Sequence, residues 1–113
     1  MGTSNIIYLG SPYSHPDPQT MQLRYEVVRD YAAFLINQGA FVFSPIVYGH
    51  EMAKHNAMPT DAVWWESFNF AFLARSNELH VCCMDGWKES KGLQAEIDFA
   101  KKNDISIAFD HTF

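Results

Sequence analysis

Apolar residues occur along this chain in two spacings, which predict strands and helices in alternation. Short apolar runs, typical of strands, are bounded by Gly, Pro, Ser or Asn. Between these runs, apolar residues recur every three or four positions, as they do on the buried face of a helix. The expected strands comprise residues 5–9, 40–43, 78–84 and 105–109.

Helices are expected between these strands, each marked by a terminal residue. The first starts near residues 18–20 and ends before Gly39, which is placed as a left-handed C-terminal cap. The second has Thr60 as its N-cap, and the third starts at Ser90. Residues 46–59 show no regular pattern, so a long loop is expected there, and such loops are more often functional than idle.

The alternation of strands and helices predicts an α/β fold with a parallel sheet. Each helix must return the chain to the same edge of the sheet, so the crossovers are expected to be right-handed. Ligands of such sheets bind in the crevice beyond the carboxyl ends of the strands. The segments expected to line this crevice are residues 10–18, 44–59 and 85–92.

Length, charge and hydropathy narrow the class of protein. The 113 residues suffice for one domain, spanning residues 1–113, and not for two. The net charge of -5 disfavours stable nucleic-acid binding, which needs clustered Lys and Arg, and leaves small molecules as ligands. No apolar run is long enough to span a membrane and no signal peptide is recognisable, so we expect a cytoplasmic protein without a membrane partner.

The adjacent Cys82 and Cys83 agree with that compartment. They lie inside an apolar run, where neighbouring side chains point to opposite faces of a strand. We therefore expect two buried thiols and no disulfide, and a reactive cysteine has no CxxC spacing behind it.

Glu96 has a position that stability alone does not explain. On the helix from Ser90, the polar residues form one stripe, and Glu96 lies off it beside Gly92 and Ala100. Burial there should raise the pKa of the carboxyl group, and such groups in clefts are candidate acids, bases or nucleophiles. The alternative is a Glu at the stripe boundary whose stem covers apolar surface while its head reaches water. Periodicity leaves both interpretations open.

Two further residues of this helix point to a ligand. Ser90 is placed to cap the helix N-terminus, where a hydroxyl group also favours an anion. Gly92 would let a ligand lie close to the backbone one turn before Glu96. A plain N-cap is the simpler account of Ser90 taken alone.

A set of motifs carries a resemblance to a known family. The motifs are the opening run Ile7-Tyr8-Leu9-Gly10-Ser11-Pro12-Tyr13, the aromatic helix before the third strand, and Ser90-x-Gly92-x-x-x-Glu96. Together and in this order, over nearly the whole chain, they resemble the nucleoside 2-deoxyribosyltransferase superfamily, which includes the deoxynucleoside 5'-monophosphate N-glycosidases. The resemblance implies a flavodoxin-like three-layer sandwich with a four- to five-stranded parallel sheet.

The resemblance also implies a reaction. A glutamate attacks the anomeric carbon of a (deoxy)nucleoside or its 5'-monophosphate, and by motif position this catalytic residue is Glu96. Water or a second base then resolves the glycosyl-enzyme ester. Tyr8 matches the catalytic tyrosine that orients the nucleophile, and Ser90 matches the residue that contacts the 5'-phosphate in the hydrolases. The alternative for Tyr8 is a tyrosine of the apolar core, and the alternative for Ser90 is a helix cap.

Other residues complete the expected site. No cofactor is expected, and no metal, because His50 and His55 are five residues apart and would lie on different faces of a helix. Arg24 is either a phosphate donor or a solvated helix residue. The residues expected to bind the substrate are Gly10, Ser11, Pro12, Tyr13, His50, Asn69, Asp85, Ser90 and Gly92.

Asn69 departs from the family pattern. The family usually carries an aspartate there, proposed to protonate the leaving base, and an amide cannot supply that proton at neutral pH. Either Asp61, Glu66 or Asp85 does this work, or the substrate has a good leaving group, or the alignment is wrong by a turn. The rival hypothesis is a non-catalytic nucleotide-binding module of the same fold.

The aromatic helix bears on oligomeric state. Its large rings belong to Trp64, Trp65, Phe68 and Phe72, which are core residues by default but exceed what one face of the sheet can hide. We therefore expect a homodimer or higher homo-oligomer. The resemblance points the same way, because family active sites are completed by a neighbouring subunit.

Overall fold

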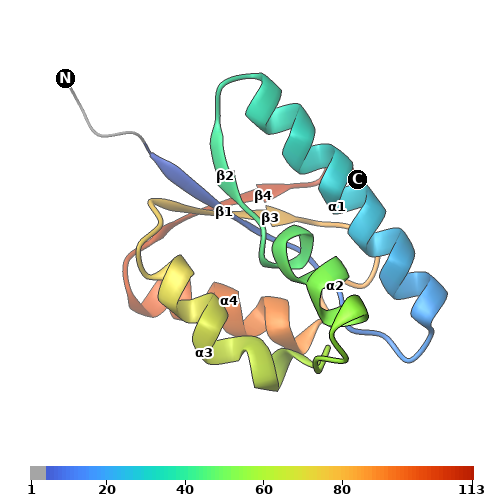
Figure 1. The fold of residues 1–113 in the computed structure, drawn as a ribbon. Helices are drawn as coiled ribbons and strands as arrows, with labels where there is room; N and C mark the ends of the chain where they lie inside the picture. The colour runs from blue at the N-terminus through green and yellow to red at the C-terminus, as the bar shows by residue number, and fades with distance from the viewer. Residues whose placement is uncertain (1–4) are drawn as a thin grey trace.

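A parallel sheet forms the centre of the protein, as Figure 1 shows. The computed structural model describes residues 5–113, and in this part of the chain the sheet has four strands in the order β2-β1-β3-β4. The strands are β1 (Ile6–Gly10), β2 (Phe41–Phe43), β3 (Glu78–Cys82) and β4 (Ser106–Asp110).

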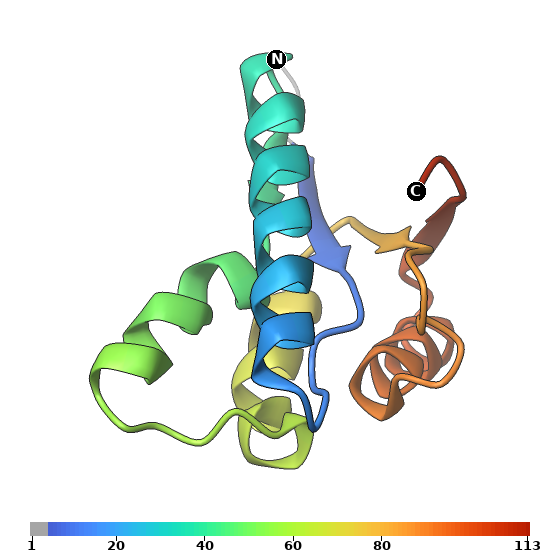
Figure 2. The same cartoon turned by 90° about the vertical axis from the view of Figure 1, so that its right-hand side faces the viewer.

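Helices cover both faces of this sheet (Figures 1 and 2). Helix α1 (Pro18–Asn37) lies on one face, while α3 (Ala62–Leu73) and α4 (Lys91–Lys102) lie side by side on the other. Helix α2 (Pro45–His55) lies beside α1 at the end where the strands finish. The fold is therefore a flavodoxin-like three-layer α/β sandwich, which confirms the predicted class.

The order of the strands places a crevice at the centre of the sheet. From β1 the chain crosses to β2 on one side, whereas β3 pairs with β1 on the other side, Tyr8 lying opposite both Phe43 and Leu79. The loops that leave β1 and β3 consequently diverge, and this is the place where parallel sheets bind ligands.

Each face of the sheet has its own apolar core. Between the sheet and α3 and α4, a cluster forms around Tyr8, Leu79 and Leu93, whereas Leu9 and Val28 anchor the cluster under α1. Cys82 belongs to the α1 cluster and Cys83 to the other, and both are buried free thiols. This confirms the prediction of two thiols on opposite faces.

The residues expected to form a loop at 46–59 are instead largely helical, because α2 occupies Pro45–His55. Ser44 caps this helix by accepting a hydrogen bond from the Val47 backbone N–H at 3.1 Å. Pro45 fits the first turn, where its missing N–H costs no hydrogen bond. The Ser-Pro pair is thus a helix start, and the mixed polarity of the following residues concealed it.

Smaller corrections concern element ends. Helix α3 begins at Ala62 with Asp61 as N-cap, not Thr60, because the Asp61 carboxylate accepts from the Trp64 backbone N–H at 2.9 Å. Strand β3 ends at Cys82, two residues before the expected end, and β4 runs from Ser106 to Asp110, one residue later than expected.

Strand β1 also runs one residue later than expected, from Ile6 to Gly10, and β2 starts at Phe41, one residue later than expected. Two predicted helix caps are confirmed. Ser90 is the N-cap of α4, and Gly39 follows α1 with a φ of 97°. Among residues 5–113, no helix has the length and apolar character needed to cross a membrane.

Candidate active site

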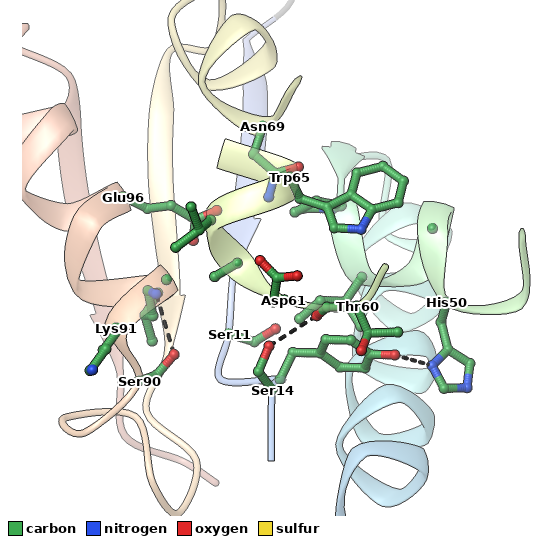
Figure 3. A pocket seen from close by; sticks show the side chains of 18 of the residues that line it. Ser11, Ser14, His50, Thr60, Asp61, Trp65, Asn69, Ser90, Lys91 and Glu96 are labelled. Atoms are coloured by element: carbon green, nitrogen blue, oxygen red, sulfur yellow. Dashed lines mark hydrogen bonds between the residues drawn. The ribbon is translucent and has the colours of Figure 1, made fainter. Parts of the chain in front are cut away.

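A cavity of about 620 Å³ opens at the carboxyl ends of the central strands. Its wall comes from the loop after β1, from α2, from the start and middle of α3, and from the first turns of α4 (Figure 3). All of the segments predicted to line the crevice contribute residues. Helix α3 adds Ala62, Val63, Trp65 and Asn69, which were not part of those segments.

Glu96 forms part of the cavity wall although only 7% of its surface is exposed. It lies in the middle of α4, on the face that packs on the sheet, which is the buried one of the two interpretations that periodicity left open. At the end of β1, a Cβ on Gly10 would lie 2.9 Å from Leu93 Cδ1, so the Leu93 side chain of α4 would have to shift, whereas the 3.4 Å to Glu96 Oε1 is an ordinary contact.

Tyr8 and Glu96 form a buried hydrogen bond, in which the phenol of β1 donates to Glu96 Oε2. Burial raises the pKa of the Glu96 carboxyl group to about 8, although the hydrogen bond from Tyr8 acts in the opposite direction. Burial, and then the charge of Glu96, hold the pKa of Tyr8 well above its usual range. The phenol therefore keeps its proton and fixes the orientation of the carboxyl group.

Two buried polar atoms on the cavity wall have no hydrogen-bond partner among the described residues: Ser11 Oγ and Asn69 Oδ1. Buried polar atoms are almost always paired, because an unpaired one costs free energy. Their position on the wall of one cavity marks them as groups that a ligand can satisfy. Both were predicted to bind substrate, and Figure 3 shows Asn69 above Asp61 and Ser11 below it.

The N-terminus of α4 borders the cavity near Glu96. The Ser90 hydroxyl accepts from the Leu93 backbone N–H at 3.3 Å, so the cap exists, and Ser90 and Lys91 also line the cavity. Gly92 lets two helices touch, because a Cβ there would lie 2.8 Å from the Ala62 Cβ of α3. The helix end thus combines a cap, a cation and a close helix contact.

His50 lies at the other end of the cavity (Figure 3), and Tyr13, which also lines the cavity, contacts His50. The Tyr13 hydroxyl lies 2.7 Å from His50 Nδ1, and His50 Nε2 lies 2.9 Å from Gln22 Oε1. The Tyr25 ring stacks on the imidazole with 4.0 Å between centroids. Burial is the main reason that the pKa of His50 is lowered, so the ring is neutral at neutral pH.

Carboxyl groups other than Glu96 differ in their access to the cavity. Asp61 lies on its wall, between the Glu96 and His50 ends, while also capping α3 (Figure 3). Glu66 borders a separate small pocket behind Glu96 and Asn69. Asp85 is exposed and does not line the cavity. Of the alternatives weighed for the missing acid, Asp61 alone faces the cavity.

The structure places some predicted residues outside the cavity wall. Neither Gly10 nor Pro12 lines it, both being buried, and the exposed Asp85 does not line it either. Arg24 does not reach the cavity either. Its guanidinium donates to the backbone carbonyls of Tyr13 and Ser14 at 3.3 Å each, and to that of Asp85 at 3.5 Å. Arg24 therefore ties together the loops after β1 and β3.

Several cavity residues were not singled out from the sequence. Lys91 was assigned to the solvated stripe of α4, and Gly49 and Ala53 fell in the supposed loop. The Ser-Pro helix start would have located α2, and with it the face that carries Gly49, His50 and Ala53 toward the cavity.

This fold and cavity define an α/β protein with a cavity at the carboxyl ends of a parallel sheet. The chain belongs to the family described as "Domain of unknown function (DUF1937)", whose model matches residues 5–110. A search of curated proteins finds no match.

Proposed function

We propose that this protein cleaves or transfers the N-glycosidic bond of a (deoxy)nucleoside or nucleoside 5'-monophosphate, with Glu96 as nucleophile. The observation that carries the proposal is a buried carboxyl group on the wall of a large cavity, held by a buried phenol. Burial of the Glu96 carboxyl group lowers the stability of the fold. Its presence on the cavity wall therefore indicates a chemical role. The resemblance to the nucleoside 2-deoxyribosyltransferase superfamily supports the same role.

In this reaction, an oxygen of Glu96 forms a bond to the anomeric carbon while the bond from that carbon to the base nitrogen breaks. The electron pair of the broken bond leaves with the base, and a glycosyl-enzyme ester remains. Water or an acceptor base then attacks the same carbon and releases Glu96. Tyr8 binds Oε2 and so positions the carboxylate, leaving Oε1 as the attacking atom.

The leaving base needs a proton, and Asn69 cannot supply it. We assign this step to Asp61, the carboxyl group on the cavity wall between the two ends. Asn69 Oδ1, buried and unpaired by any described residue, would instead accept a hydrogen bond from the substrate.

The two ends of the cavity suit the two ends of a nucleotide. Ser90, Lys91 and the N-terminus of α4 favour an anion such as a 5'-phosphate. At the other end, Trp65 offers an aromatic ring fixed by its Nε1 hydrogen bond to the Pro59 carbonyl at 2.7 Å. A base placed beside this ring would lie between Asn69 and His50, with the sugar next to Glu96.

The second candidate function is a non-catalytic nucleotide-binding module. Two observations favour it: Asn69 stands where an acid is expected, and the pKa of Glu96, at about 8, leaves most of this group protonated at neutral pH in the free protein. A protonated carboxyl group is a poor nucleophile.

The experiment that separates these functions follows free base by chromatography, using nucleosides and 5'-monophosphates with and without acceptor bases. Wild type is compared with Glu96→Ala and with Asp98→Asn, an exposed control on the same helix. Base release that is lost only in Glu96→Ala supports the proposal, and a need for acceptor base indicates a transferase. No release, with melting still raised by a nucleotide, indicates the binding module.

We also propose that the protein forms a homodimer or higher homo-oligomer through α3. Trp64 is 53% exposed and Phe72 is 43% exposed, so these rings do not belong to the core. They continue into a stacked series in which the Phe43 and Phe72 centroids are 4.5 Å apart. An exposed aromatic face of this kind is typical of protein interfaces.

A further inference from the structure

A chain of hydrogen-bonded side chains runs from the surface of α1 to the cavity. Gln22 Nε2 donates to Glu26 Oε2 at 2.9 Å, and Gln22 Oε1 lies 2.9 Å from His50 Nε2. His50 Nδ1 in turn lies 2.7 Å from the Tyr13 hydroxyl. Figure 3 shows the cavity end of this chain at His50. Four residues from α1, α2 and the loop after β1 are thereby joined.

The direction of every bond in this chain follows from its first member. A carboxylate only accepts, so the amide nitrogen of Gln22 faces Glu26 and its oxygen faces His50. That oxygen also only accepts, so His50 Nε2 carries the proton. In the neutral ring, Nδ1 is then bare and accepts, and the donor to it is the Tyr13 hydroxyl.

Tyr13 therefore has no proton left for a ligand. Its hydroxyl oxygen keeps acceptor capacity, and Tyr13 lines the cavity. The end of the cavity at His50 thus presents an oxygen acceptor, the Tyr13 hydroxyl group, and a ligand bound there must bring a hydrogen-bond donor.

We propose that Tyr13 is a specificity-determining residue that accepts a hydrogen bond from an amino group of the substrate base, with the Glu26, Gln22 and His50 chain fixing its proton. The identity of the ligand rests on the proposed function. A base with an amino group supplies the required donor. The matching base with a keto group instead places its oxygen next to the Tyr13 oxygen, and neither atom can donate. A site built to bind one hydrogen-bonding group rejects an analogue that leaves it unpaired.

The first test uses matched pairs of 2'-deoxynucleoside 5'-monophosphates: adenine against hypoxanthine, and cytosine against uracil. Dissociation constants come from calorimetry, and base release is followed in parallel. Wild type should bind the amino member of a pair at least about tenfold more tightly than the keto member. In Tyr13→Phe, which lacks the acceptor, the preference should fall below about threefold.

A second test reverses the direction of the hydrogen bonds in this chain by a substitution of Glu26, which does not line the cavity. In Glu26→Lys, the ammonium group donates to Gln22 Oε1 and turns the amide nitrogen toward His50 Nε2. The imidazole proton then moves to Nδ1 and is donated to Tyr13, whose own proton becomes available to the ligand. The preference should shift toward the keto member. Asp30→Lys, an equal charge change at an exposed position of the same helix, should leave the wild-type preference unchanged.

The tautomer of His50 can be read without any ligand from the ring ¹⁵N shifts in NMR spectra. Wild type should show the proton on Nε2, and Glu26→Lys should show it on Nδ1. A wild-type proton on Nδ1 overturns the inference, even if the Glu26→Lys variant fails to fold.

The outcomes separate this inference from the proposed function. Base release with no amino preference overturns the role of Tyr13 alone. An amino preference in binding without base release overturns the glycosidic reaction alone. Failure of every nucleotide in the panel to bind overturns both.

Discussion

Tyr8 in the central strand donates a hydrogen bond to Glu96 in α4, and both side chains are buried between the sheet and the helix. The two residues are 88 positions apart in the chain. The bond joins the first strand to the last helix at the cavity wall, and it makes the ionisation of Glu96 depend on a neighbour that no solvent reaches.

Glu96→Gln should stabilise the fold at neutral and higher pH. The pKa of Glu96 is raised from 4.5 to about 8, so ionisation of this group is easier in the unfolded chain than in the folded protein. The resulting loss of stability grows as pH rises from 4.5 and is complete above about 8. Gln stays neutral and still accepts from Tyr8.

We expect the variant to be more stable by about 1–3 kcal/mol at the upper end of this range. Melting temperatures of both proteins between about pH 5 and 9 check this, since the difference should widen with pH. A constant difference, or a less stable variant at every pH, would contradict it.

Tyr8→Phe should impair base release while leaving substrate binding nearly unchanged. Loss of the phenol removes the hydrogen bond that lowers the pKa of Glu96, so this pKa rises further. The rising limb of the kcat profile should move to higher pH, and kcat should fall about 10- to 100-fold at neutral pH. Tyr48→Phe, at an exposed tyrosine of α2, is the control. An unshifted profile in Tyr8→Phe would show that the phenol only fills space.

Asp61→Asn should lower kcat without unfolding α3, because Asn caps a helix as well as Asp does. If Asp61 protonates the leaving base, kcat should fall about 100-fold or more for natural bases. Substrates with a good leaving group, which need no proton, should be affected little. The matched control is Asp85→Asn, outside the cavity wall, which should retain activity. Equal loss for good and poor leaving groups would exclude Asp61 as the acid.

Gly92→Ala should weaken the contact between α3 and α4. The added methyl group would lie 2.8 Å from the Ala62 Cβ, so the helices must separate at the cavity wall. We expect a loss of about 1–3 kcal/mol in the free energy of unfolding, measured by denaturant titration. Ala62→Gly in the same chain should restore part of it. Without such rescue, the effect of Gly92→Ala would have a cause other than this contact.

Trp64→Glu should weaken self-association by placing a charge on the exposed face of α3. Sedimentation at micromolar concentration should show a dimer or larger species for wild type and a monomer for the variant. Phe34→Glu, at an exposed ring of α1, is the control and should behave as wild type. A monomeric wild type would contradict the proposed self-association through α3.

The fold and the place of Glu96 off the polar stripe are predictable from the sequence because both depend on short-range periodicity, whereas the burial of its carboxyl group is not. The helical period separates Glu96 from the polar stripe of α4, and the alternation of elements fixes a parallel sheet with its crevice. Ser90 as a cap is likewise a local signal, and the structure confirms it.

Other parts of the site depend on contacts between distant residues. Tyr13 and His50 are 37 positions apart, and their hydrogen bond requires α2, which the sequence pattern did not reveal. Asp85 lies in the expected loop, but its side chain is exposed outside the cavity wall, and its carbonyl accepts a hydrogen bond from Arg24. No pattern along the chain distinguishes a loop residue that faces a cavity from one that faces water.

Arg24 has a consequence for how this site can change in evolution. It contacts the loops after β1 and β3 only through backbone carbonyls, and Gly86, with a φ of 87°, leaves room for its guanidinium. Backbone carbonyls are the same in every amino acid, so these bonds of Arg24 do not depend on which side chains positions 13, 14 and 85 carry. Gly86 is the constrained position, because a Cβ there would lie 2.4 Å from the guanidinium. The link between the two loops can therefore stay in place while the exposed Asp85 side chain changes.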